Sequence, residues 1–142
     1  MGSLTNYAEN AIMGHLFASA YTAPSTVYLA LCTADPTEAA TGASMNEVAN
    51  SGSYARQAIT FGAASSRRVT SGAVTFTQAT GSWGTVTHWV IVDSATHGAG
   101  NALAYGSLGE SKTVISGNTP SVGTGIVYVE ISASNGASDY LA

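Results

Sequence analysis

The chain has 142 residues, of which 45% are hydrophobic and only 8% are charged, and its formal net charge is -4. This length is typical of one domain with a real hydrophobic core, and the composition excludes an intrinsically disordered chain, which would be less hydrophobic and more charged. Lysine and arginine total four, too few for the phosphate neutralisation that nucleic-acid binding requires. We therefore predict no nucleic-acid partner and a surface suited to dense packing against other proteins.

The chain holds a single cysteine, Cys32, which excludes an internal disulfide framework. Its place in the apolar run 27–32 predicts a buried residue that acts as a small hydrophobe rather than as a nucleophile. The first residues lack the basic and apolar regions of a secretion signal, and no apolar run approaches the roughly 20 residues of a membrane span. We expect a chain that is made in a cytoplasm, assembles there and makes no membrane contact.

In chain order, the first predicted element is a helix over residues 4–19, where apolar side chains recur at helical spacing. Ser3 or Thr5 can cap its N-terminus. Met13 and Phe17 widen the apolar stripe beyond one face of the helix. A helix that is apolar on more than one side needs two partners. We expect these to be the chain's own β domain and a neighbouring subunit.

The rest of the chain is predicted to form strands and turns. Strand signals lie at 26–33, 54–61, 73–78, 85–93, 101–108, 111–116 and 125–133. A loop over 33–53 separates the first two, and it is long for a compact domain. Short strands with regular turn signals favour a sandwich or barrel over alternating β and α units.

The predicted fold is all-β: an antiparallel β-sandwich, jelly-roll-like, with one N-terminal α-helix. Its expected parts are an N-terminal helical segment 1–20, a β-sandwich domain 21–133 and a C-terminal tail 134–142. These boundaries follow the change from helical to strand periodicity and the loss of strand signals near the end of the chain.

One predicted strand carries large apolar side chains on both faces. Simple alternation places Val86, Val90 and Val92 on one face, and Trp89 and Ile91 on the other. Such a strand is central in its sheet, or its second face is covered by the helix or by a partner.

The sequence contains no motif with specific catalytic or metal-binding chemistry. His88 and Asp93 belong to one predicted strand, but their odd separation places them on opposite faces. Asp35, Glu38 and Glu47 share the long loop, yet their spacing fits no calcium-binding motif. We predict no catalytic residue, no cofactor and no metal site, and hence a protein that is not an enzyme.

The two tryptophans, Trp83 and Trp89, bracket the central strand. Two interpretations stay open at this point. One indole can form a stacking platform for a sugar, or both can fill the core at the ends of strands.

Four segments, taken together and in order, resemble a widespread group of small virion proteins of tailed phages and prophages. They are residues 28–37, 47–59, 83–95 and 103–114, and their most specific parts are Ser53-Tyr54-Ala55-Arg56 and Trp83-Gly84-Thr85-Val86-Thr87-His88. Members of the group are labelled head-decoration, capsid cement or tail-fibre proteins. The resemblance spans residues 20–132, implies a virion location and a β-sandwich, and brings no catalytic residues with it.

The leading hypothesis from the resemblance and the low charge is a capsid decoration or cement protein. It would be a homotrimer that is assembled in the host cytoplasm, binds the phage major capsid protein on the outer shell and cross-links its subunits. The alternative is a tail or tail-fibre-associated protein that contacts other tail subunits or host-surface polysaccharide.

The expected oligomer or partner interface combines the apolar stripe of the helix with two apolar anchors in the tail. Its residues are Leu4, Tyr7, Ile12, Met13, Leu16, Phe17, Tyr140 and Leu141.

Overall fold

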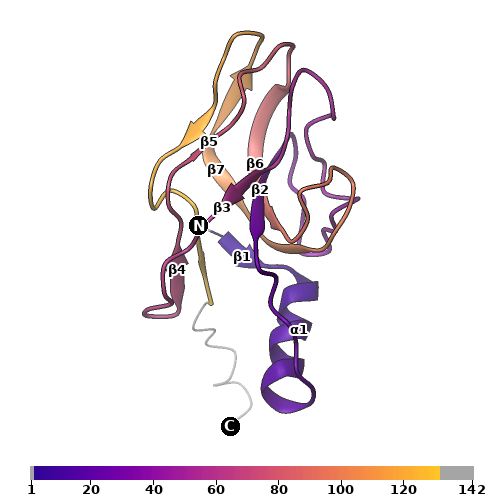
Figure 1. Cartoon of the computed structure of the whole chain (residues 1–142), viewed down its shortest axis with the longest axis vertical. Helices are drawn as coiled ribbons and strands as arrows, with labels where there is room; N and C mark the ends of the chain where they lie inside the picture. The colour runs from indigo at the N-terminus through magenta and orange to yellow at the C-terminus, as the bar shows by residue number, and fades with distance from the viewer. Residues whose placement is uncertain (1, 132–142) are drawn as a thin grey trace, which may run out of the picture.

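A computed structural model describes residues 2–131, which form a mostly β fold with one helix near the N-terminus (Figure 1). The elements in chain order are β1 (Gly2–Leu4), α1 (Asn6–Phe17), β2 (Val27–Cys32), β3 (Gln57–Ile59), β4 (Arg68–Thr70), β5 (Val74–Thr75), β6 (Gly84–Val92), β7 (Ala102–Val114), β8 (Ser121–Val122) and β9 (Tyr128–Glu130).

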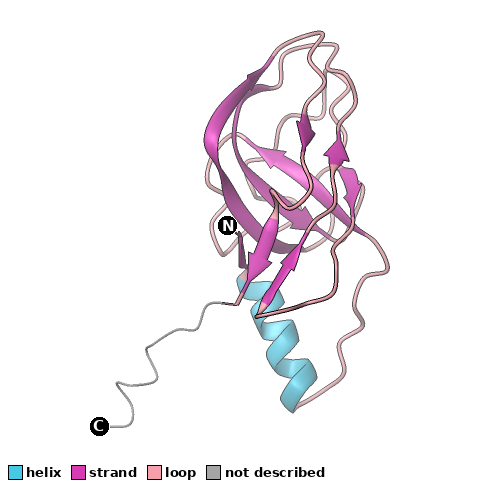
Figure 2. Cartoon of the chain, turned by 90° about the vertical axis from the view of Figure 1, so that its left-hand side faces the viewer, coloured by secondary structure: helices cyan, strands magenta, loops and turns pink. Residues whose placement is uncertain are grey.

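The main sheet of the described chain has seven strands in the order β3-β2-β6-β7-β1-β9-β4, while β5 and β8 form a separate two-stranded ribbon. Figure 2 shows this sheet curling into a half-barrel. The two edge strands, β3 and β4, are also linked to each other just after β3 ends. Phe61 forms an isolated β-bridge with Ser71, and the Gly62 N–H donates to the Thr70 carbonyl at 3.0 Å. The prediction of a mostly β fold with an N-terminal helix is confirmed, but one curled sheet replaces the expected sandwich of two facing sheets.

The first three described residues are a strand, so the predicted helix begins too early. Strand β1 pairs antiparallel with β7 and parallel with β9. The helix starts after Thr5, whose side-chain oxygen accepts the N–H of Ala8 at 3.3 Å as an N-cap. Gly2 permits the insertion of β1, because a Cβ at this position would collide with the ring of Trp89. Leu4 is therefore a half-buried strand residue packed on the core, and its placement on the helix face was wrong.

Other strand bounds also differ from the sequence prediction. The two segments predicted at 101–108 and 111–116 belong to the single long strand β7. The ladder between β6 and β7 is interrupted, however, since Val86 pairs with Lys112 while His88 pairs with Ser107. The apparent gap between two strands was thus a bulge within one. The short strands β1, β4 and β8 had not been predicted.

The core consists of two apolar clusters on opposite faces of the main sheet. The larger lies between this sheet and the β5–β8 ribbon and includes Leu29, Leu31 and both tryptophans. Val86 belongs to this larger cluster together with Trp89 and Ile91, whereas Val90 and Val92 belong to the second. Simple alternation had grouped these residues differently, and the bulge after Val86 is the reason.

The second cluster is covered by the chain's own long loop. Ala40 and Met45 of that loop pack with Ala30, Cys32 and other small residues of β2, β6 and β7. The strand β6 is thus central in its sheet, and part of its second face is covered by this loop. The length of the loop therefore has a structural purpose: it completes the core.

Candidate interaction surfaces

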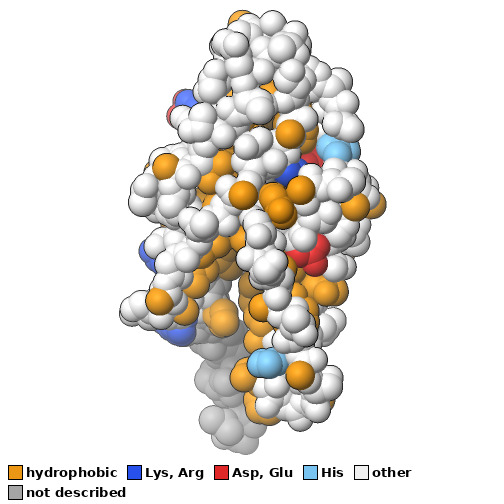
Figure 3. All heavy atoms as spheres, viewed as in Figure 1, with side chains coloured by type: hydrophobic (Ala, Val, Ile, Leu, Met, Phe, Trp, Pro, Cys, Tyr) orange, Lys and Arg blue, Asp and Glu red, His pale blue; other side chains and the backbone are white. Residues whose placement is uncertain are grey.

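Helix α1 extends beyond the β domain and exposes a group of large apolar side chains (Figures 1 and 3). Met13, Leu16 and Phe17 are 57, 65 and 77% exposed. Their spacing of three and four residues places them on one side of the helix near its C-terminal end. We call these three residues the helix patch. Single exposed apolar residues are ordinary on a protein surface, but a contiguous group on a projecting element is typical of an interaction site.

The helix makes few contacts of its own with the β domain. Its twelve residues are all described, and Ala8 is the one that is buried. Ile12 is half-buried, and Tyr7 is 40% exposed on another side of the helix from the patch. The far end is held by the returning chain, since the Tyr21 N–H donates to His15 Nδ1 at 3.0 Å.

Charge is scarce around the helix patch. The helix contains no lysine or arginine, and Glu9 is its one acidic residue. Burying the patch against a partner would therefore strand few charged groups away from water. Of the expected interface residues, Tyr7, Ile12, Met13, Leu16 and Phe17 thus lie on this projecting helix.

The other two residues of the expected interface, Tyr140 and Leu141, lie outside the described residues.

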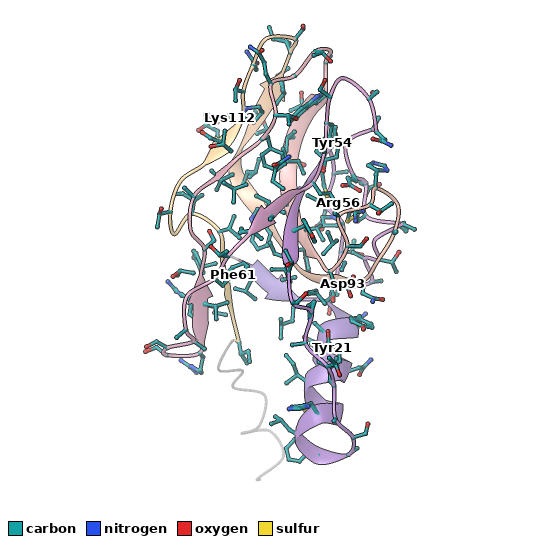
Figure 4. The ribbon with its side chains drawn as sticks, in the orientation of Figure 1. Tyr21, Tyr54, Arg56, Phe61, Asp93 and Lys112 are labelled. Carbon is teal, nitrogen blue, oxygen red and sulfur yellow. The ribbon has the colours of Figure 1, made fainter. Side chains whose placement is uncertain are left out.

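A buried polar network fixes the long loop to the sheet, and Figure 4 labels Tyr54 and Arg56 at its centre. The Arg56 Nε and one terminal nitrogen donate to the two carboxylate oxygens of Glu47, each at 2.9 Å. The remaining guanidinium N–H groups donate at 2.9 Å to backbone carbonyls of three loop residues: Gly42, Ser94 and Ala99. All five N–H donors of the guanidinium are thereby satisfied.

Tyr54 connects this network to the core. Its hydroxyl donates to Glu47 Oε1 at 2.8 Å and accepts the N–H of Leu31 at 3.0 Å. Burial first, and then the nearby Glu47 carboxylate, raise the pKa of Tyr54. The same two causes raise the pKa of the buried Cys32 thiol to about 12. Cys32 is therefore a thiol and not a thiolate at neutral pH, which agrees with its predicted role as a small hydrophobe.

Both tryptophans are core residues, with 4 and 2% exposure for Trp83 and Trp89. The Trp83 Nε1–H donates to the Gly52 carbonyl at 2.8 Å, and the ring packs edge-on against Tyr54. Of the two interpretations of these residues, core filling is confirmed. A sugar platform formed by either indole is wrong, because neither ring face is open to solvent.

His88 and Asp93, considered above for catalysis, do not come together in a site. His88 is half-buried, with its Nδ1 2.8 Å from Thr87 Oγ1. Asp93 lies just past the end of β6, and its carboxylate accepts two hydrogen bonds from Asn101. Within residues 2–131, no three metal-ligating side chains come together.

No helix of this described part is long and apolar enough to cross a membrane.

The network around Glu47, Tyr54 and Arg56 was not predicted from the sequence. One signal pointed toward it: residues 54 and 56 are two apart on a predicted strand and so face the same side. The position of Glu47 against them depends on the path of the long loop, which no local pattern encodes.

The described chain is thus a mostly β domain with a projecting helix that exposes apolar side chains, and its buried polar network holds loops in place. Residues 3–130 match the model of a family described as podophage GP4 fiber I protein gp80. The chain belongs to this family of phage fibre proteins; it is a structural, non-enzymatic component of the virion. No curated protein matches the chain.

Family membership corrects one expectation drawn from the resemblance. The virion location is confirmed, but the family is one of fibre proteins and not of capsid decoration or cement proteins. The tail-fibre alternative therefore has better support than the capsid-cement interpretation.

Proposed function

We propose that this chain is a tail-fibre-associated subunit that attaches to neighbouring virion subunits through the helix patch. The observation that carries the proposal is the exposure of Met13, Leu16 and Phe17, at more than half of each side chain, on a helix that projects from the β domain. The fibre family supplies the setting in which such a surface would be covered.

The energetics favour burial of the helix patch. A large apolar side chain gains roughly 1.5–3 kcal/mol when it is moved fully from water into a packed interface. Three such side chains supply several kcal/mol before the costs of association are subtracted. Multiple copies in a fibre would add to this gain by multivalency. The expected homotrimer remains a prediction, in which the helices of three copies would cover one another.

Contact with host polysaccharide has less support than subunit attachment. The expected platform for a sugar was one of the tryptophan rings, and both rings are buried. The proposal therefore assigns to this chain a connecting role rather than a receptor-binding one.

The test is a phage that carries the triple change Met13→Ser, Leu16→Ser and Phe17→Ser in this chain. The matched control is Ile115→Ser, which removes an apolar side chain of 55% exposure from the β domain. Quantitative mass spectrometry of purified particles measures incorporation, and thermal unfolding of the purified variants checks that each folds.

The triple variant is expected to fold normally but to be missing from particles, while the control is incorporated. Normal incorporation of the triple variant would contradict the role of the helix patch. Separation of heads from tails before the measurement tests the location, and recovery of the chain with heads alone would contradict the tail-fibre assignment.

A further inference from the structure

An apolar groove of about 250 Å³ opens between the β6–β7 strands and the β5–β8 ribbon. Its floor is formed by buried residues of the larger core cluster, among them Leu31, Phe76 and Val114. Its rim includes the half-buried Val122 and Ile126, which is 61% exposed. The groove thus runs from an exposed rim down to the buried side chains of the larger core cluster.

The size and lining of the groove suit large apolar side chains. A cavity of about 150 Å³ lined by apolar residues can hold a benzene ring, so 250 Å³ has room for an aromatic ring and a branched aliphatic group. One cation, Lys112, lies at the rim and is labelled in Figure 4. Its Nζ is 3.4 Å from Glu110 Oε2, but both side chains are largely exposed, so this pair is weakly held.

We propose that the C-terminal segment 132–142 of the same chain binds in this groove. In this segment, Tyr140 and Leu141 are the two large apolar side chains, and the residue before them is its one charged residue, Asp139. The tyrosine ring and the leucine side chain fill the groove, and the Asp139 carboxylate lies against the ammonium of Lys112. The occupant thus matches the groove in size and in apolar character, and its carboxylate competes with Glu110 for the ammonium of Lys112.

The length of the chain lets the segment reach the rim of the groove at Ile126. Ile126 at the rim and Ile131, the last described residue, are five residues apart and thus separated by at most about 17 Å. The nine residues from Ile131 to Tyr140 can span up to about 30 Å when extended. A short tether also gives its own end an effective concentration in the millimolar range, well above that of other copies in dilute solution. The chain's own segment is therefore favoured over a second copy.

The experiment is a disulfide cross-link between the groove and the segment in the purified full chain. Ser121→Cys places a thiol on the exposed edge of the groove, and Ala142→Cys places the other beside the apolar anchors without removing them. The matched control pair is Ser44→Cys with Ala142→Cys, since Ser44 lies on the exposed long loop and not in the groove. The native Cys32 is buried and stays in all variants.

In oxidised glutathione, the Ser121 pair is expected to cross-link within the monomer at least about tenfold faster than the control pair, because docking raises the local thiol concentration. Adding Tyr140→Ser and Leu141→Ser to the Ser121 pair should reduce the rate to that of the control. Equal rates for the two pairs, or no effect of removing the two anchors, would overturn the proposal. Cross-linked dimers in place of cross-linked monomers would show that a second copy supplies the segment, and would overturn the intrachain assignment.

Discussion

Replacing Arg56 with methionine is expected to strand the Glu47 carboxylate in the interior. Methionine retains an apolar stem that reaches the position of Nε, but it removes the guanidinium and its five hydrogen-bond donors. The two partners are buried, with side-chain exposures of 0% for Arg56 and 5% for Glu47. Removing one partner of a buried ion pair costs about 3–5 kcal/mol, and a domain has only about 5–15 kcal/mol of stability in total. The variant should therefore lose a large share of its stability.

Urea unfolding followed by tryptophan fluorescence measures this loss, because Trp83 and Trp89 are both buried and report on the core. The double variant Arg56→Met with Glu47→Gln separates the stranded charge from the lost hydrogen bonds. Glutamine has no charge, and its carbonyl can still accept the hydroxyl of Tyr54. The double variant should therefore recover about 1–2 kcal/mol relative to the single variant. A single variant that loses less than about 1 kcal/mol, or a double variant no more stable than the single one, would refute this reasoning.

Three further predictions concern the N-terminal segment and the buried thiol. Gly2→Val should prevent β1 from docking on Trp89, and hydrogen exchange should then show lost protection in β9 while β2 keeps its protection. Thr5→Ala should cost about 1–2 kcal/mol in thermal or urea unfolding, since it removes the helix cap and a buried hydrogen bond; an unchanged midpoint would contradict the role of the cap. Cys32 should resist alkylation at pH 8. Burial raises its pKa from 9.0 to about 12, so its contribution to stability is complete below pH 9 and is lost as pH rises from 9 to 12, and the raised pKa of Tyr54 adds a loss in the same direction above pH 10. Stability that stays constant over this range would contradict the burial of the thiol.

The helix and the central strands were predictable because their signals are local. Thr5 caps a segment with clear helical spacing, and both β2 and β6 lie within their predicted ranges to about one residue. Strands β1, β4 and β8 have two or three residues each, which is too short for a period of two to be recognised. The curl of the sheet also depends on pairs far apart in the chain, such as β1 with β9, and no window of sequence contains both partners.

Of the two candidate surfaces, the helix patch arises from one local segment and the groove from several distant ones. The sequence predicted that Met13 and Phe17 lie outside a single apolar face, so that one domain could not bury every apolar side of the helix, and both are exposed. The apolar groove was not foreseen, since its lining comes from β2, β6, β7 and the segments around β5 and β8. The alternation of side chains along β6 assigned Val86 to the wrong face, because a single bulge reverses the face of every residue that follows it.

The place of β1 in the sheet has a consequence for the order of folding. Gly2 pairs with Gly106 of β7 on one side and with Val129 of β9 on the other. Strand β1 therefore has no complete place in the sheet until β9 has been made, and Val129 lies 127 residues after Gly2 in the chain. Contacts of such long sequence separation are slow to form, so in a nascent chain β1 stays unpaired on one side until β9 has left the ribosome. A chaperone, or a protein fused ahead of Gly2, that occupies these residues during translation would delay the closing of the sheet and leave β7 and β9 with open edges prone to aggregation.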